Sequence, residues 1–557
     1  MKRLFYVALA TVFLVFGIEV LPTQAATTGG PFGPRVSLVG SVIPLFDKND
    51  GAPSAGLGGR LFFAGRDARG LGSELWATDA TGTGTRLVKD IRPGAEGSGP
   101  GNFIRFKNRV YFTAYDGAEA EWWVTDGTTA GTRRFVDFSP GTSSNPGRPV
   151  VAGNQMFFAA TTAASGRELW VTDGTAAGTR LVKELGAGDV GVGIYGLTAF
   201  GTKVVFGGYQ AGVAKAFVSD GTVAGTGRLD TTGPGVQVGA LGFTVLGDQV
   251  LFSAEGSAAG DELWSSRGVV GDAQLFKEFV PGTSGGAPRS LVRLGSSVIF
   301  TVTTPGIGRE LWSTDGTVGG TVPLRDIWPG SDGGDPSNLV RSGSSVYFSA
   351  RTSSDDHELW TTDGSTAGTR RVADIRVGAS GSYPFVVAAG GTRVLLSAND
   401  KITGGEPWVS DGTAAGTKRL GDFWPGELGS DPILVGMLGG TALFRVNTAE
   451  ESYRLAAYTL PVARLKASPK KSYARSDAAR KKIRIRVTVA GAGGVPTGRV
   501  ALYKGSKRVG SATLSGGAAK VRITTKLRRG KHTLVVRYGG SLWAQSNSSV
   551  PFRIRVR

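Results

Sequence analysis

The chain has no cysteine, and only two of its 557 residues are histidine. The missing cysteine excludes disulfide bonds, thiolate metal sites and thiol nucleophiles. The two histidines, His357 and His532, lie far apart in the sequence, and neither a histidine proton relay nor a two-histidine metal site is expected. No loop ends in the Gly-Lys-Thr/Ser of a phosphate-binding motif. We therefore predict no catalytic residue, no cofactor and no enzymatic activity.

Long apolar runs are also scarce, and the one at the N-terminus indicates export. Lys2 and Arg3 precede an apolar stretch of 15 residues, Leu4 to Ile18, and the small-residue cleavage site Thr23-Gln24-Ala25 follows. This order is typical of a signal peptide, predicted here as residues 1–25 with cleavage at Ala25. A retained membrane anchor is the alternative, but such a helix needs roughly 20 apolar residues. We expect a secreted or cell-surface protein without a transmembrane segment after signal removal.

A phrase close to Glu-Leu-Trp-x-Thr-Asp-Gly-Thr returns along most of the chain. Its tryptophan, or the residue in its place, recurs at intervals of 47, 47, 47, 47, 48, 48 and 48 residues. These positions are Trp76, Trp123, Trp170, Phe217, Trp264, Trp312, Trp360 and Trp408. Self-similarity at this period predicts repeated supersecondary units, each unable to bury its apolar face alone.

Each unit contains four short β-type runs separated by turn-forming residues. One copy has runs at 322–327, 337–341, 345–350 and 358–362, with Pro329-Gly330 and Asp363-Gly364 between them. Four strands in about 47 residues match the blade of a β-propeller. We predict an all-β fold with a propeller of eight to nine four-stranded blades over residues 26–460.

The run that corresponds to 345–350, which carries an aromatic residue in most copies, recurs nine times and favours nine blades. The segment Val42 to Asp47 resembles the run that follows each Asp-Gly-Thr turn, and we predict that it completes the last blade. A ring closed by both termini removes the exposed edges that an open array would leave. An open β-solenoid remains the alternative fold.

The repeated tryptophan and the repeated acids each have a structural and a functional interpretation. The tryptophan could stack on sugars, but its recurrence favours packing between blades. The acids could act in acid–base catalysis or as metal ligands. Since Gly and Thr follow most of these aspartates, a tight turn is favoured, with weak Ca²⁺ binding at the Asp-Gly turns not excluded. The acids are Glu74, Glu121, Glu168, Glu262, Glu310, Glu358 and Glu406, with Asp79, Asp126, Asp173, Asp220, Asp315, Asp363 and Asp411.

Residues 35–460 resemble the bacterial ELWxxDGT-repeat proteins, as in Glu168 to Thr175 and Glu310 to Thr317. The resemblance implies a secreted repeat protein, and it supports the architecture more than a particular activity. The copies around Phe217, Arg267 and Ala456 depart from the pattern.

The C-terminal segment differs sharply in charge. From residue 461 onward there are 24 Lys and Arg and one acid, Asp477, whereas the first 460 residues hold 39 basic and 43 acidic residues. Ile483, Ile485 and Val487 alternate with arginines, as in a strand buried on one face. We predict a basic linker at 461–482 and an immunoglobulin-like β-sandwich at 483–557.

The C-terminal segment resembles a bacterial immunoglobulin-like repeat domain. The matching segments are 496–503, 510–514, 527–534 and 538–540. Such domains act as spacers or adhesive modules on exported proteins.

These observations favour a monomeric, non-enzymatic interaction or adhesion protein. Its partners would be an anionic cell-wall polymer, a polysaccharide or a surface protein, because a dense positive field attracts polyanions, while specific nucleic-acid binding is not expected. The alternative is an extracellular propeller hydrolase or lyase acting on polysaccharide, for which Asp355, Asp356, Glu450 and Glu451 are the acids outside the repeat pattern. The candidate polyanion-binding residues are Lys470, Lys471, Arg475, Arg480, Lys481, Lys482, Arg484, Arg486, Arg528, Arg529 and Lys531.

Overall fold

The computed structural model is all-β, as predicted. It describes residues 35–39, 41–45, 53–67, 70–230, 241–256, 259–390, 393–438, 441–449, 453–459, 464–469, 472–474, 476–477, 483–490, 499–505, 507–514, 518–525, 527–538 and 549–557. The predicted signal peptide and its cleavage site at Ala25 lie outside these residues. Across the described ranges, no helix has the length and hydropathy needed to cross a membrane.

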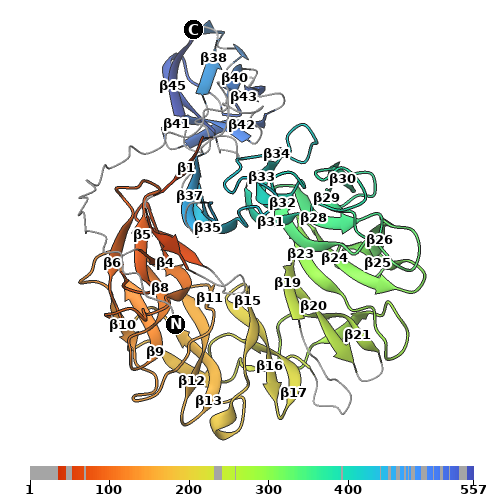
Figure 1. The fold of residues 1–557 in the computed structure, drawn as a ribbon. Helices are drawn as coiled ribbons and strands as arrows, with labels where there is room; N and C mark the ends of the chain where they lie inside the picture. Colours follow the sequence, from red (N-terminus) through yellow and green to blue (C-terminus); the bar gives the residue numbers. More distant parts are fainter. Residues whose placement is uncertain are drawn as a thin grey trace, which may run out of the picture.

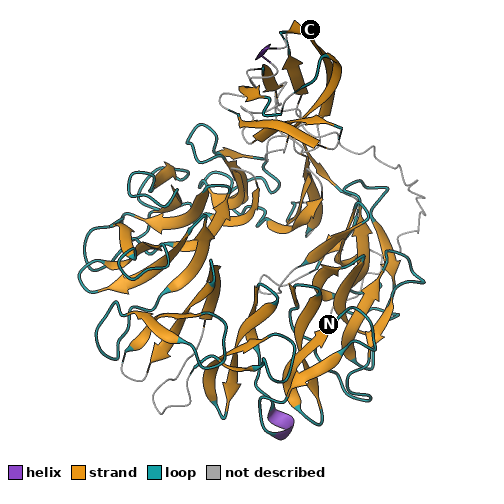
Figure 2. Ribbon diagram, turned by 180° about the vertical axis from the view of Figure 1, so that it is seen from behind, coloured by secondary structure: helices purple, strands orange, loops and turns teal. Residues whose placement is uncertain are grey.

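The repeat segment forms nine antiparallel sheets in the part of the chain that the structure describes, arranged around a common centre (Figures 1 and 2). The first five contain β2 (Ile43–Pro44), β3 (Ser54–Leu57), β4 (Arg60–Arg66), β5 (Glu74–Thr78) and β6 (Arg86–Lys89); β7 (Gly101–Phe106), β8 (Arg109–Tyr115), β9 (Ala120–Thr125) and β10 (Arg133–Val136); β11 (Val150–Ala152), β12 (Gln155–Thr162), β13 (Gly166–Thr172) and β14 (Arg180–Lys183); β15 (Tyr195–Phe200), β16 (Lys203–Gln210), β17 (Val213–Ser219) and β18 (Gly227–Arg228); β19 (Leu241–Leu246), β20 (Gln249–Gly256), β21 (Gly260–Ser266) and β22 (Gln274–Lys277). A short 3₁₀ helix, η1 (Gly188–Val190), follows β14.

The remaining four sheets continue the same pattern. They contain β23 (Arg289–Leu294), β24 (Ser297–Thr304), β25 (Gly308–Thr314) and β26 (Val322–Arg325); β27 (Ser337–Ser342), β28 (Ser345–Arg351), β29 (His357–Thr362) and β30 (Arg370–Ala373); β31 (Phe385–Gly390), β32 (Arg393–Asn399), β33 (Gly405–Ser410) and β34 (Lys418–Arg419); β35 (Ile433–Leu438), β36 (Thr441–Val446) and β37 (Arg454–Thr459) with β1 (Arg35–Leu38). The tryptophan run is the third strand of its sheet, since the first run of each sequence copy belongs to the preceding sheet.

The last sheet takes its fourth strand from the N-terminal part of the chain. Strand β1 pairs antiparallel with β37, and the N–H of Val39 donates to the carbonyl of Leu455 at 2.7 Å. The prediction that Val42 to Asp47 fills this place was wrong, because β2 within that segment pairs with β4 of the first sheet. Val42 to Asp47 and β1 have similar apolar patterns, so only the strand pairing shows which of them completes the last sheet. The N-terminal segment thus supplies β1 to the last sheet and β2 to the first sheet, and so connects the two.

The apolar core lies between successive sheets. Trp123 packs with Phe62 and Leu75 of the first sheet and Phe112 of its own sheet. Phe217, the substitute for tryptophan, packs with Phe157 of the preceding sheet in the same way. The prediction that these aromatic residues serve packing between sheets is therefore confirmed, because each fills the space that a single sheet cannot close.

The C-terminal segment forms two further sheets whose buried faces share one core. The three-stranded sheet contains β38 (Arg464–Ser468), β40 (Arg484–Ala490) and β43 (Ala518–Arg522), and the five-stranded sheet contains β39 (Ser472–Tyr473), β45 (Ser549–Val556), β44 (Gly530–Tyr538), β41 (Arg499–Lys504) and β42 (Lys507–Thr513). Ile485 and Val521 of the first sheet pack with Leu534 and Ile554 of the second.

The predicted linker at 461–482 needs a correction. It includes β38, which pairs with β40, and β39, which pairs with β45. The basic and small residues of this segment suggested a loop, but β38 finds a hydrogen-bonding partner at the edge of β40. The immunoglobulin-like sandwich thus begins earlier than residue 483.

Candidate functional site

The repeated glutamates are buried. Each lies near the start of the third strand of its sheet, where no solvent reaches its side chain. The residues at 0 % exposure are Glu74, Glu121, Glu168, Glu262, Glu310, Glu358 and Glu406. A substrate cannot reach these carboxylates in this arrangement, and their partners explain why they recur.

Each buried glutamate holds the loop that leads from its own sheet to the next. Glu358 accepts hydrogen bonds from the backbone N–H groups of Ile375 at 2.9 Å, Arg376 at 3.2 Å and Ser382 at 3.0 Å. The hydroxyl of Ser382 donates to the same carboxylate at 2.7 Å. A buried backbone donor must find a partner, and one carboxylate serves several of them here.

The serine is present in four sheets and missing in three. Ser98, Ser144, Ser382 and Ser430 each donate a hydroxyl to the glutamate of their sheet. In the other three, one carboxylate oxygen of Glu168, Glu262 and Glu310 is buried without a hydrogen-bond partner. In two of them, Gly286 and Gly334 replace the serine, and a Cβ there would lie 2.8 Å from Phe279 and 2.6 Å from Ile327. Apolar side chains thus fill the space that a serine would need.

Burial changes the acidity of these glutamates. It raises the pKa of Glu168 to about 7, and the hydrogen bonds from Gly186 and Leu185 offset this only in part. It also raises the pKa of Glu406 to about 7, against the hydrogen bond from Ser430. A raised pKa and a cleft would together indicate a catalytic acid. Complete burial among backbone donors indicates a structural carboxylate instead.

The fourth sheet reverses the charges. Lys215 stands where the other sheets have glutamate, and its Nζ lies 3.5 Å from a carboxylate oxygen of Asp230. The side chain of Asp230 is fully buried and also pairs with Arg228. In the preceding sheet Glu184 raises the pKa of Glu168, whereas here the acid Asp230 has a cation as its partner. An ion pair replaces the carboxylate without exposing the site.

The repeated aspartates form the tight turns that the sequence predicts. Oδ1 of Asp126 accepts the N–H of Thr128 at 3.0 Å and its hydroxyl at 2.7 Å. These bonds hold the pKa of Asp126 below its usual range. A Cβ on Gly131 would lie 2.1 Å from the same carboxylate, which explains why a glycine recurs five residues after these aspartates.

One turn lacks the aspartate and keeps its geometry. Arg267 stands at that position, and Asp272 supplies the carboxylate from the other side of the turn. Its oxygens accept the N–H of Arg267 at 2.8 Å and the N–H of Val269 at 3.3 Å. The turn therefore requires an acceptor but not a fixed position for it, as expected for a structural group.

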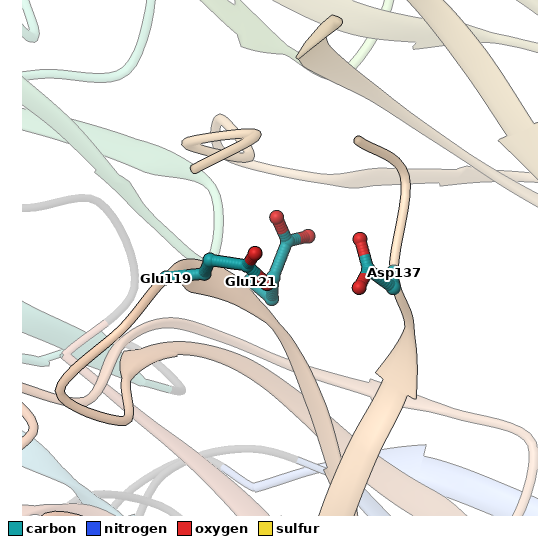
Figure 3. A group of neighbouring side chains, drawn as sticks. All are labelled: Glu119, Glu121 and Asp137. Carbon is teal, nitrogen blue, oxygen red and sulfur yellow. The ribbon is translucent and has the colours of Figure 1, made fainter. Parts of the chain in front are cut away.

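Two groups of three carboxylates have the spacing of cation ligands. Figure 3 shows one of them, in which Glu121 and Asp137 lie opposite one another with Glu119 beside them. The guanidinium of Arg134 already pairs with Glu119 at 2.5 Å and with Asp137 at 3.1 Å. In the other group, Asp356, Glu358 and Asp374, Arg371 has the corresponding position. A protein cation thus balances part of the charge in each group.

Of the four acids named outside the repeat pattern, the two that the structure describes, Asp355 and Asp356, have different partners. Asp355 accepts the hydroxyl of Tyr383, whose ring stacks on His357 with centroids 5.4 Å apart. Asp356 points instead to Arg371 and to the hydroxyl of Thr352. Burial lowers the pKa of His357. Glu450 and Glu451 lie outside the described residues. Asp355 and Asp356 alone do not form the pair of facing carboxylates that the enzyme hypothesis needs.

The predicted polyanion-binding residues fall on different parts of the sandwich. Arg484 and Arg486 are exposed on β40, Lys531 is exposed on β44, and Arg528 and Arg529 are exposed just before β44. Arg484 and Lys531 are thus on the outer faces of different sheets. Six of the candidates, Lys470, Lys471, Arg475, Arg480, Lys481 and Lys482, lie outside the described residues.

Sequence reasoning missed three exposed cations of the three-stranded sheet. Lys466 of β38 and Lys520 and Arg522 of β43 share the outer face with Arg484 and Arg486 of β40. Their alternation with apolar residues was visible in the sequence. Which strands are neighbours was not, because pairing between β40 and β43 joins segments about 35 residues apart.

Comparisons with known proteins bear on the two regions unequally. Residues 471–556 match the model of the bacterial Ig-like domain (group 3). No curated protein matches the chain.

Among solved structures, a puromycin hydrolase is 14 % identical with a TM-score of 0.35, over 58 % of this chain and 53 % of its own. Oligopeptidase B from Trypanosoma brucei is 11 % identical with a TM-score of 0.37, over 70 % of this chain and 53 % of its own. TolB from Acinetobacter baumannii is 12 % identical with a TM-score of 0.25, over 45 % of this chain and 62 % of its own. The chain spans about half the length of the puromycin hydrolase and of the oligopeptidase. Its C-terminal region is similar in sequence to bacterial Ig-like domains.

Proposed function

We propose that this protein is an exported, non-enzymatic interaction module of the ELWxxDGT-repeat type. Its propeller-like ring presents loops to a glycan or protein partner, and its basic sandwich holds the ring at an anionic polymer of the cell surface. The ring and the sandwich thus have separate tasks.

The contrast in how charge is used carries this proposal. The glutamates of the repeat are buried and hold backbone N–H groups, as Glu358 does. The arginines of the sandwich, such as Arg484 and Arg486, are exposed and stand in a region with a single acid. Exposed charge of one sign attracts a polyanion over a distance set by the salt concentration.

Retention of residues 26–557 on immobilised polyanions tests the proposal. Inorganic polyphosphate and polygalacturonate serve as anionic matrices, and dextran serves as the neutral control. We expect retention on an anionic matrix that weakens as salt rises, because ions screen exposed charge. Absence of retention on both anionic matrices at low salt would refute the proposal. New reducing ends released from soluble glycans would favour a polysaccharide-cleaving enzyme instead.

A further inference from the structure

The outer face of the three-stranded sheet concentrates cations. Side chains that point inward along β40 and β43, among them Ile485 and Val521, are buried, and those that point outward are mostly basic. No residue of β38, β40 or β43 is acidic. We name this surface the cationic face and define it by its five exposed cations, Lys466, Arg484, Arg486, Lys520 and Arg522.

Strand register places four of these cations in one block. Arg484 lies directly opposite Arg522, and Arg486 lies directly opposite Lys520. Side chains in directly opposite positions have Cβ atoms about 5 Å apart, and like charges there oppose folding. Successive outward positions on one strand are about 6.7 Å apart, twice the rise per residue. A row of anions along the strands would relieve this repulsion at several points together.

The outer face of the five-stranded sheet is basic but less regular. Lys531 lies opposite Arg555, whereas Arg553 lies opposite Thr533. Arg537 of this face stacks on the ring of Tyr503 at 4.6 Å. Between β44 and β45 this face therefore has one directly opposite like-charged pair where the cationic face has two in succession, and it provides a matched control.

The chemistry of the cationic face favours a partner with dense charge. Among the described residues of the sandwich, no large hydrophobic side chain is exposed. Such a surface offers no anchor for a membrane core and no stacking platform for sugars or bases. Three of its five cations are arginines, whose planar fork donates two parallel hydrogen bonds to a phosphate.

We propose that the cationic face is the docking site of a linear phosphate polymer, whose phosphates follow the rows of cations along β40 and β43. This inference rests on the proposed function and names the surface and the partner. Contact between the cations of the face and the phosphates carries the binding, with release of counterions from the polymer.

Two triple variants of residues 26–557 test the face against its control. In the face variant, glutamine replaces Arg484, Arg486 and Arg522. In the control variant, glutamine replaces Lys531, Arg553 and Arg555. Both remove three positive charges from exposed positions on outer strand faces. The measurement is the dissociation constant for long-chain inorganic polyphosphate at several salt concentrations, with thermal unfolding as the check on folding.

We expect the face variant to bind at least tenfold more weakly and the control variant about twofold more weakly. The slope of log K against log salt should fall by about 2 in the face variant, since each lost phosphate contact removes about 0.7 from it. Equal losses in the two variants would refute the cationic face and leave the proposed function standing. Failure of the unaltered protein to bind any polyanion would refute both.

Further arms separate the possible partners. Stronger binding to polygalacturonate, single-stranded DNA or phosphatidylglycerol vesicles than to polyphosphate would refute the phosphate polymer as partner. If the face variant does not fold, the variant with lysine at the same three positions keeps the charge. Retained affinity in that variant refutes the contribution of the arginine fork, and a loss of threefold or more supports it.

Discussion

The ring and the sandwich use charged residues in opposite ways. In the ring, glutamates such as Glu358 are buried and accept hydrogen bonds from backbone N–H groups. In the sandwich, arginines such as Arg486 stand in solvent opposite another cation. A buried charge needs hydrogen-bond or ionic partners within the protein, whereas an exposed charge does not. The comparison shows that burial or exposure of a charged residue, and not the sign of its charge, determines whether it stabilises the fold or is available to bind a partner.

The largest effect should follow from removing a buried carboxylate. Glu358→Ala leaves the N–H groups of Ile375 and Ser382 and the hydroxyl of Ser382 without their acceptor. We expect the free energy of unfolding to fall by about 3–5 kcal/mol, measured by denaturant titration. Glu427→Ala, which removes an exposed acid from a neighbouring loop, should cost less than about 0.5 kcal/mol. Equal losses would show that burial is not what distinguishes the two acids.

Stability of the ring should depend on pH between the ordinary glutamate value of 4.5 and about 7. The folded state raises the pKa of Glu168 and Glu406 to about 7 and so binds their protons more tightly than the unfolded state does. Their contribution is complete below pH 4.5 and is lost as the pH rises through 7. The unfolding temperature of the Glu406→Gln variant should therefore change less between pH 5 and pH 7.5 than that of the unaltered protein. An equal change in unfolding temperature for the variant and the unaltered protein would contradict this prediction.

An intermediate effect should come from the Asp-Gly-Thr turns. Gly131→Ala places a Cβ 2.1 Å from Oδ1 of Asp126, and we expect a loss of about 1–3 kcal/mol in the free energy of unfolding. In the background of Asp126→Ala the carboxylate is gone, and the same change should cost much less. Chemical denaturation of the two single variants and the double variant gives the coupling. Simple additivity would rule out the steric explanation.

The smallest effect on stability should occur on the cationic face. Arg486→Glu replaces a like-charged cross-strand pair with an opposite pair, because Lys520 lies directly opposite. The free energy of unfolding of the sandwich should rise by less than about 1 kcal/mol, while the affinity for polyphosphate falls. Differential scanning calorimetry and a binding titration measure the two quantities. A fall in both the free energy of unfolding and the affinity for polyphosphate would show that Arg486 also stabilises the fold, against the contrast drawn between the ring and the sandwich.

Sequence reasoning was accurate where a local pattern repeats. The Trp period predicted the sheets because every copy of the unit repeats the same strand pattern. The Asp-Gly-Thr phrase predicted the turns because their hydrogen bonds join neighbours within a few residues. It failed where two segments had similar patterns, as with Val42 to Asp47 and β1, or where a strand such as β38 was short and basic. It also could not assign the glutamates, whose partners lie 17 to 24 residues further along the chain.

The sequence by itself determined the all-β class, the repeated unit and the uneven charge, because alternation, turn residues and composition are properties of the chain. Only the tertiary structure decided which strand closes the last sheet, which donors each buried glutamate satisfies, and which cations share one face. Those outcomes depend on strand pairing and burial between distant segments. Hydrogen bonding and desolvation act there on groups that the sequence does not place side by side.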